Sequence, residues 1–218
     1  MNAVRPPRMT ALAQLREAES GGSFAILIGT ILSARTRDEN TARVVKNLLA
    51  RYATAEALAS AQLEDVEEII HSIGFYHVKA RRVIEVASMI CREFGGQVPE
   101  DMDTLLKLPG VGRKTANCVL VYAFGKPAIP VDIHVHRISN RLGIVKTKTP
   151  EETEQDLMRI IPTEHWLEIN DTFVRYGQNI CKPIMPSCGV CRIRGLCKYY
   201  AGMNDPDIAE GATTRPVT

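Results

Sequence analysis

The stretch Leu-Pro-Gly-Val-Gly-Arg-Lys-Thr-Ala at residues 108–116 decides the fold and contains the first candidate site. Apolar residues before and after it predict two helices, and the hairpin that joins them is short and rich in glycine. Gly110 and Gly112 can adopt positive φ and let a ligand approach the backbone closely. The amides that open the second helix then point outward, which predicts an anion site suited to a phosphodiester.

Lys114 lies on the first turn of that second helix. The positive end of the helix dipole and the neighbouring Arg113 disfavour the protonated amine, so Lys114 is a candidate nucleophile. Asp132 follows the breaker run at residues 125–130, which turns the chain back towards the lysine. A carboxylate and an activated amine beside a phosphate-binding hairpin indicate chemistry on a nucleic-acid sugar. The alternatives are a phosphate contact for Lys114 and a helix N-cap for Asp132.

Four cysteines near the C-terminus follow the pattern Cys-x6-Cys-x2-Cys-x5-Cys and form a second candidate site. They are Cys181, Cys188, Cys191 and Cys197. Four thiolates on a short loop can hold an iron–sulfur cluster or a tetrahedral zinc ion, and the spacing alone does not separate the two. Positive charges within or just after the loop predict contact with a DNA backbone, or otherwise only solvated charges on a structural loop. These are Arg192, Arg194 and Lys198.

Composition limits the classes of protein to which the chain can belong. The 218 residues suffice for one large domain or two small ones, and the net charge of +2 requires any DNA-binding face to be a local patch. No apolar run is long enough to span a membrane, and the first ten residues lack the core of a signal peptide, so we expect an intracellular protein. Cys91 and Cys118 lie on apolar helix faces and are expected to be buried thiols.

The apolar pattern predicts an all-α chain, because helical spacing recurs and no alternating strand pattern is found. The run at 24–32 has no polar face, which is typical of a helix in the middle of a bundle. Residues 203–218 lack apolar periodicity and are expected to form a disordered tail. The other expected helices are 10–18, one capped by Asp38, 54–58, 62–73, 78–94, 136–142, one starting at Thr149-Pro150, and 166–177.

The hairpin, Lys114, Asp132 and the four cysteines stand in the order found in the endonuclease III family of DNA glycosylases, which this chain resembles. The resemblance implies two helical domains with the active site in the cleft between them. One is a six-helix barrel at 17–127, with the helix-hairpin-helix at about 101–124. The other joins 1–16 to 128–202, where the cysteine pattern holds a [4Fe-4S] cluster in the family.

The resemblance also implies an activity, that of a bifunctional DNA glycosylase and AP lyase of base excision repair. Lys114 would attack C1′ of a flipped nucleotide and form a Schiff base, and β-elimination would cut the strand 3′ to the abasic site. Asp132 would stabilise positive charge on the sugar or help to deprotonate the lysine. A lysine at 114 and a chain that ends soon after Cys197 favour the branch that acts on oxidised pyrimidines such as thymine glycol. The adenine-specific branch typically lacks that lysine and carries an extra C-terminal domain.

Two residues are candidates to fill the gap that a flipped nucleotide leaves in the base stack. Arg35 stands where relatives usually have glutamine, and Phe75 is the variable residue of an Ile-Gly-x-Tyr turn. Their alternatives are a surface arginine and a core aromatic. The expected partner is double-stranded DNA with damaged bases or abasic sites, bound by a monomer in the cytoplasm or nucleoid.

Three other functions remain open from the sequence. The first is a monofunctional thymine–guanine mismatch glycosylase, for which the arginine at position 35 leaves room. The second is a module that binds damaged DNA without catalysis. The third is an iron–sulfur or zinc protein whose hairpin serves only packing.

Overall fold

The computed structural model describes residues 12, 22–34 and 38–203. Within this part of the chain every regular element is a helix, which confirms the all-α prediction. The described residues divide after Pro130 into two units, which we call the N-terminal and the C-terminal unit. The expected helix at 10–18, Arg35 and the tail from 204 onward lie outside the description. No helix in the described ranges is long and apolar enough to cross a membrane.

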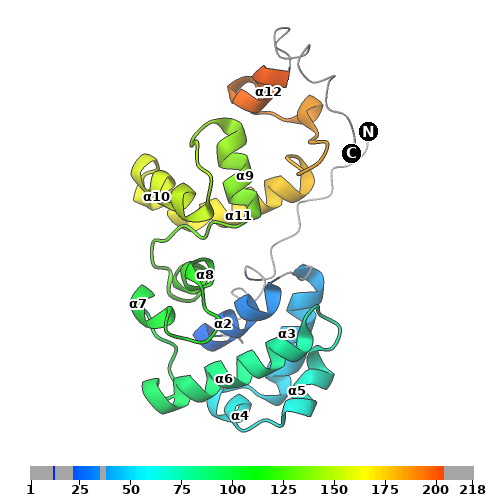
Figure 1. The fold of residues 1–218 in the computed structure, drawn as a ribbon, viewed down its shortest axis with the longest axis vertical. Coiled ribbons are helices and arrows are strands. Elements are labelled where there is room, and N and C mark those ends of the chain that lie inside the picture. Colours follow the sequence, from blue (N-terminus) through cyan, green and yellow to red (C-terminus); the bar gives the residue numbers. More distant parts are fainter. Residues whose placement is uncertain (1–11, 13–21, 35–37, 204–218) are drawn as a thin grey trace, which may run out of the picture. The chain divides into compact units, whose positions relative to one another are not determined.

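Helix α2 (Gly22–Ser33) forms the centre of the N-terminal unit. Every side chain from Ala25 to Leu32 is buried, because the helix packs against α3 (Asp38–Arg51), α6 (Tyr76–Phe94) and α8 (Arg113–Phe124) on different sides (Figure 1). This confirms the prediction that a helix without a polar face lies inside a bundle.

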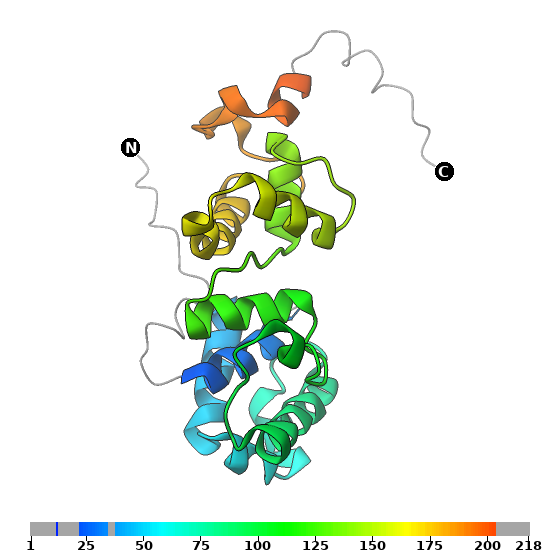
Figure 2. The same cartoon turned by 90° about the vertical axis from the view of Figure 1, so that its left-hand side faces the viewer.

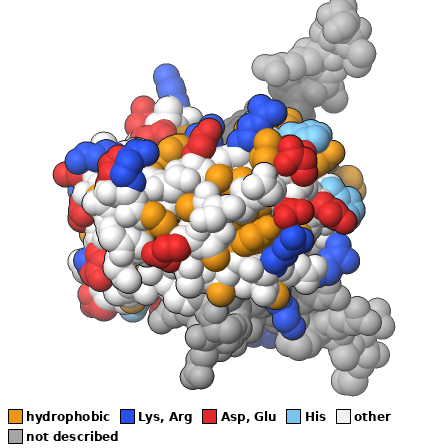
Figure 3. Space-filling model, turned by 90° about the horizontal axis from the view of Figure 1, so that it is seen from below, with side chains coloured by type: hydrophobic (Ala, Val, Ile, Leu, Met, Phe, Trp, Pro, Cys, Tyr) orange, Lys and Arg blue, Asp and Glu red, His pale blue; other side chains and the backbone are white. Residues whose placement is uncertain are grey.

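Two short helices, α4 (Ala55–Ala59) and α5 (Leu63–Ile70), pack against α6. Thr54 caps α4 as expected, since its hydroxyl accepts a bond from the Ala57 amide at 3.2 Å. Helix α5 ends at Ile70, not at 73 as predicted, because the buried Ile73 continues the apolar stripe from a turn. On the face of this unit seen in Figure 3, acidic and basic side chains are interspersed, so this face carries no patch of one sign.

The C-terminal unit consists of α9 (Ile133–Leu142), α10 (Pro150–Ile160), α11 (Trp166–Asn179) and α12 (Lys198–Met203). Helix α9 contacts the other three (Figure 2). Its buried residues Val135 and Ile138 meet a core to which Leu157 and Ile169 also contribute. Short 3₁₀ turns lie at Thr163–His165, Cys188–Val190 and Arg194–Leu196.

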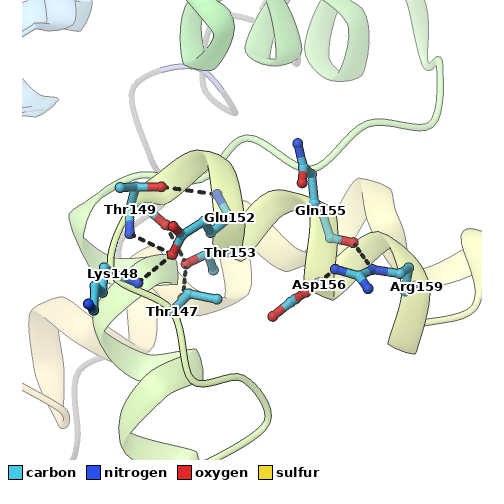
Figure 4. Close-up of polar contacts among 8 residues, drawn as sticks. All are labelled: Thr147, Lys148, Thr149, Glu152, Thr153, Gln155, Asp156 and Arg159. Atoms are coloured by element: carbon cyan, nitrogen blue, oxygen red, sulfur yellow. Dashed lines mark hydrogen bonds and ion pairs between the residues drawn. The ribbon is translucent and has the colours of Figure 1, made fainter.

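Helix α10 begins with the cap that the sequence predicted. The Thr149 hydroxyl accepts a bond from the Glu152 amide at 3.2 Å, and the Glu152 carboxylate accepts one from the Thr149 amide at 3.4 Å (Figure 4). The same carboxylate accepts a bond from the Lys148 amide at 2.7 Å. Pro150 takes the first helical position, where its missing N–H costs nothing. This capping box fixes where the chain turns from α9 into α10.

Three further sequence expectations need correction. Cys118 is fully buried, as expected, but Cys91 is only half-buried because it lies at the edge of the apolar face of α6. Met203 is the last residue of α12, not the start of a tail. Helix α9 starts at Ile133, before the expected 136, because Asp132 caps it.

Candidate functional site

Two buried side chains, Leu108 and Val111, anchor the hairpin between α7 (Met102–Leu105) and α8 in the core. Its glycines are exposed. Gly110 has φ 69°, in the left-handed region that glycine favours, as predicted. Gly112 does not use this freedom, since its φ is −89°, an ordinary extended conformation. A Cβ at Gly112 would meet nothing within 4 Å, so glycine at this position leaves the backbone open to a ligand.

Helix α8 starts beside these glycines and has no side-chain cap, because its N-cap residue is Gly112. Arg113 and Lys114 occupy its first turn, as the sequence predicted. Arg113 is exposed and Lys114 is half-buried. The positive end of the α8 dipole therefore faces the hairpin together with two cationic side chains, which suits a phosphate group.

A further cation at the hairpin was not found from the sequence. The guanidinium of Arg82, on α6, lies beside Gly110, where an added Cβ would come within 2.4 Å of Nη1. No local motif marks Arg82, because only the packing of α6 beside the hairpin brings the two together. The hairpin thus presents Arg82, Arg113 and Lys114 within one unit.

Phe75 projects from the turn that opens α6. Its side chain is 62% exposed, so the alternative that it is a core aromatic is wrong. Its φ is 59°, in the left-handed region, where an aromatic residue is strained. The combination of backbone strain and an exposed aromatic ring is typical of functional sites. Arg35, the other candidate for this role, lies outside the described residues.

Asp132 in the C-terminal unit is the N-cap of α9. Its Oδ1 accepts bonds from the amides of His134 at 2.8 Å and Val135 at 2.9 Å. The predicted cap is therefore present, and it does not use Oδ2. His134 packs within the unit, since its Nδ1 accepts a bond from Arg137 at 3.1 Å.

Two arginines on one face of α9, which the sequence reading missed, hold the first cysteine of the loop. Arg137 donates to the Cys181 carbonyl at 2.8 Å. Arg141 donates to Cys181 Sγ at 3.5 Å and to the carbonyls of Lys182 and Pro183 at 2.6 and 2.7 Å. The guanidinium of Arg141 also lies over the ring of Tyr199, 4.5 Å from its centroid. In the sequence, the spacing of four residues between Arg137 and Arg141 indicates that both lie on one face of a helix.

The four loop cysteines line one pocket, whose walls include apolar residues such as Ile138 and Ile180. Tyr176 Oη lies 2.9 Å from Cys191 Sγ, and Cys197 Sγ donates to the Arg141 carbonyl at 3.3 Å. Burial, and then the other three thiols, raise the pKa of Cys188. Cysteines bind a metal centre as thiolates, and the positive charge of such a centre would offset the repulsion among four of them.

The cations of the loop are exposed, but two of them also have structural contacts. Arg194 Nη1 donates to the Gly189 carbonyl at 2.8 Å. The side chain of Lys198 packs over Gly143, where an added Cβ would come within 2.2 Å of its Cδ. Arg192 is exposed at the surface of the same loop. Of the three predicted phosphate contacts, Arg192 is thus the simplest one to change.

The sequence of this chain is similar to those of known proteins. Residues 28–163 match the model of the HhH-GPD superfamily of base excision DNA repair proteins. Over 177 residues the chain is 50% identical to endonuclease III of Thermotoga maritima, covering 81% of this chain and 83% of the relative. The chain belongs to the endonuclease III family. It is therefore a DNA glycosylase of base excision repair.

Solved structures agree with this membership. A trapped covalent intermediate of endonuclease III with DNA superposes with a TM-score of 0.79 at 37% identity, covering 88% of this chain and 95% of that one. A thermostable thymine-DNA glycosylase gives a TM-score of 0.75 at 25% identity, covering 88% and 94%. Family members therefore share the fold of this chain and include an enzyme that has been trapped on DNA.

Proposed function

We propose that this chain removes oxidised pyrimidines of the thymine glycol type from duplex DNA and then cleaves the strand 3′ to the abasic site. The position of Lys114 carries the proposal. It is a half-buried amine on the first turn of a helix without a side-chain cap, beside an exposed glycine hairpin. A relative 37% identical to the chain has been trapped covalently on DNA, which supports a nucleophile of this kind.

The reaction begins when the Lys114 amine attacks C1′ of the flipped nucleotide, and the bond from C1′ to the base breaks. The amine then loses a proton, the bond from C1′ to O4′ breaks as O4′ takes up a proton, and the opened sugar carries a Schiff base between Nζ and C1′. Removal of a C2′ proton then breaks the bond from C3′ to oxygen, which is the β-elimination that cuts the strand. The Asp132 carboxylate stabilises positive charge on the sugar or accepts the amine proton.

The phosphates flanking the flipped nucleotide bind at the hairpin. Gly110 and Gly112 let the DNA backbone come close, and Arg113 contributes charge from the first turn of α8. Phe75 enters the gap in the base stack, as its exposure allows, and Arg35 is the second residue proposed for this role. We propose that the enzyme acts as a monomer on damaged DNA in the nucleoid. We propose further that the N-terminal unit is the barrel domain and the C-terminal unit the cluster domain, with the division after Pro130 and α12 in the second.

A [4Fe-4S] cluster is the group proposed for the cysteine pocket. Cys181, Cys188, Cys191 and Cys197 all line it, and cysteine thiolates are the ligands that hold such a cluster. In the described part of the chain no three His, Cys, Asp or Glu side chains are arranged to hold a single metal ion. Four-cysteine sites hold either zinc or an iron–sulfur cluster, and membership of the endonuclease III family favours the cluster. A cluster held by the four cysteines would stabilise the loop that carries Arg192, Arg194 and Lys198.

Analysis of the purified protein distinguishes the two groups. We expect iron and acid-labile sulfide in about equal amounts, and loss of both when Cys188 is changed to serine. Stoichiometric zinc without sulfide would refute the cluster.

Borohydride trapping tests the catalytic proposal. A duplex carrying thymine glycol is incubated with the wild type and with Lys114→Gln, and the Schiff base is reduced to a stable adduct. We expect a covalent adduct with the wild type alone, because glutamine has no nucleophilic amine. Base loss without an adduct in the wild type would refute the lyase, and binding without either product would refute catalysis.

The second candidate is a monofunctional thymine–guanine mismatch glycosylase, favoured by the likeness to a thymine-DNA glycosylase. In that case Asp132 would activate water and Lys114 would contact phosphate. If the Lys114→Gln variant still excises thymine opposite guanine, the enzyme has this activity.

A further inference from the structure

Lys79 is a buried lysine whose ammonium group joins two distant parts of the N-terminal unit. Its side chain is 7% exposed and lies in the first half of α6, one turn after Phe75. Nζ donates to the Leu32 carbonyl at 2.9 Å and to the Ala34 carbonyl at 2.7 Å, 47 and 45 residues earlier. These carbonyls lie at the C-terminal end of α2, where helix carbonyls lack partners within the helix.

The turn that carries Phe75 is held from a second side. The Asn40 side-chain amide, on the first turn of α3, donates to the Ser72 carbonyl at 2.7 Å. The Ser72 hydroxyl donates back to Asn40 Oδ1 at 3.4 Å. The Phe75 turn is thus bound to the end of α2 through Lys79 and to the start of α3 through Asn40.

The backbone conformation of Phe75 is one that its surroundings must hold in place. Its ring is 62% exposed, and its backbone is in the strained left-handed region. A strained conformation persists only when the surrounding structure over-determines it. The Lys79 amide donates to the Phe75 carbonyl at 3.0 Å, so the residue that holds the end of α2 also makes the first helical bond behind Phe75.

We propose that Lys79 is a positioning residue, which locks the Phe75 turn against the end of α2 so that the turn enters the DNA stack as a rigid element. The proposal rests on the proposed function, because only an enzyme that flips a nucleotide out of a duplex leaves a gap to fill. A turn that is already ordered loses less conformational entropy on insertion than a mobile one. The free-energy cost of ordering the turn in this way is the burial of the Lys79 ammonium group.

Lys79→Met tests the proposal, because it keeps the apolar stem and removes both donated bonds. Two substrates are compared: duplex DNA with thymine glycol, which requires flipping, and single-stranded DNA with an abasic site, which does not. We expect single-turnover excision from the duplex to fall by about tenfold to a hundredfold. Trapping on the single strand should stay at the wild-type level.

The matched control is Arg92→Met, which removes one positive charge from the far end of the same helix, where Arg92 is paired with Glu93 at the surface. It should leave both reactions unchanged. Equal losses on both substrates in Lys79→Met would overturn the proposal, since they indicate a general loss of structure. If that variant does not fold, Asn40→Ala takes its place, because it weakens the other link without disturbing a buried charge.

A double variant with Phe75→Ala tests whether Lys79 acts through Phe75. If it does, the loss in Lys79→Met, Phe75→Ala should be close to that of Phe75→Ala alone, because a missing ring needs no positioning. Losses that multiply would overturn the proposal while leaving the proposed function intact. A wild type that processes neither substrate would overturn the proposed function and this proposal with it.

Discussion

The Asp132 carboxylate has two roles, one in the fold and one in the proposed chemistry. Asp132 Oδ1 closes the start of α9 through two amides, and the proposed chemistry needs its negative charge near the sugar. The two roles use different properties of the side chain, namely an acceptor oxygen for the cap and a charge for catalysis. They can therefore be separated by substitution.

We expect Asp132→Asn to keep the fold and lose activity. Asparagine caps a helix about as well as aspartate, but it carries no charge. Asp132→Ala should lose activity as well and should also lower the free energy of unfolding by about 1 kcal/mol, because the cap is gone. Urea denaturation together with single-turnover excision measures both effects. An Asn variant with wild-type excision would refute the need for charge at this position.

Lys79 gives the stability of the protein a characteristic pH dependence. Burial lowers its pKa from 10.5 to about 8. Between these two values the unfolded chain binds more protons at this position than the folded one, so stability rises with pH in this window. Below pH 8 both states are protonated and the contribution is constant.

The difference in unfolding free energy between the wild type and Lys79→Met should therefore grow between pH 8 and 10.5 in favour of the wild type. The full change corresponds to about 3 kcal/mol. Urea titrations of both proteins across this range measure it, and the subtraction removes the other titrating groups. A constant difference would show that the two carbonyl bonds keep the ammonium group charged at its ordinary pKa.

At the scale of single elements, the sequence predicted most of what local rules determine. The caps at Thr54, Asp132 and Thr149 and the exposed hairpin glycines follow from residue types at fixed offsets. The range predicted for helix α5 is too long, because Ile73 is buried but lies outside the helix. Apolar periodicity reports burial rather than helical hydrogen bonds.

What sequence reasoning missed depends on contacts between distant segments. Arg82 reaches the hairpin from α6, and Arg141 reaches Cys181 from α9. Lys79 did leave a local trace, since it continues the apolar stripe of Val83, Val86 and Ile90 along α6. A lysine on such a stripe is expected to have buried partners, but only the fold identifies them as carbonyls of α2.

The two hairpin glycines allow a test of what each contributes. Gly110→Ala places a side chain at φ 69° and against Arg82, so we expect it to lower the unfolding free energy by about 1 to 2 kcal/mol. Gly112→Ala meets no atom within 4 Å at an ordinary φ, so stability should change by no more than about 0.5 kcal/mol.

DNA affinity should nevertheless fall in Gly112→Ala, because the new methyl group obstructs the approach of a phosphate to the backbone. Fluorescence anisotropy with an abasic-site duplex measures the affinity, and thermal melting provides the stability control. Full affinity in Gly112→Ala would show that the phosphate does not reach the backbone at this position.

At the scale of the whole molecule, the net charge of +2 is too small to attract DNA by itself. Binding must come from local groups of cations, and each unit has one. The N-terminal unit presents Arg82, Arg113 and Lys114 at the hairpin, and the C-terminal unit presents exposed cations on the cysteine loop. Each phosphate contact made by these groups adds to the salt dependence of binding.

Neutralising the loop cations should therefore flatten the dependence of log affinity on log salt concentration. Each phosphate contact contributes about 0.9 to the slope, so Arg192→Gln should reduce it by about 1 and the triple variant with Arg194→Gln and Lys198→Gln by about 2 to 3. Because Arg194 also bonds the Gly189 carbonyl, iron content must be measured for the triple variant. Arg159→Gln, which removes a surface charge paired with Asp156 on α10, is the matched control and should leave the slope unchanged. A wild-type slope in the triple variant with full iron content would show that the loop is a structural support and that the hairpin alone binds the DNA backbone.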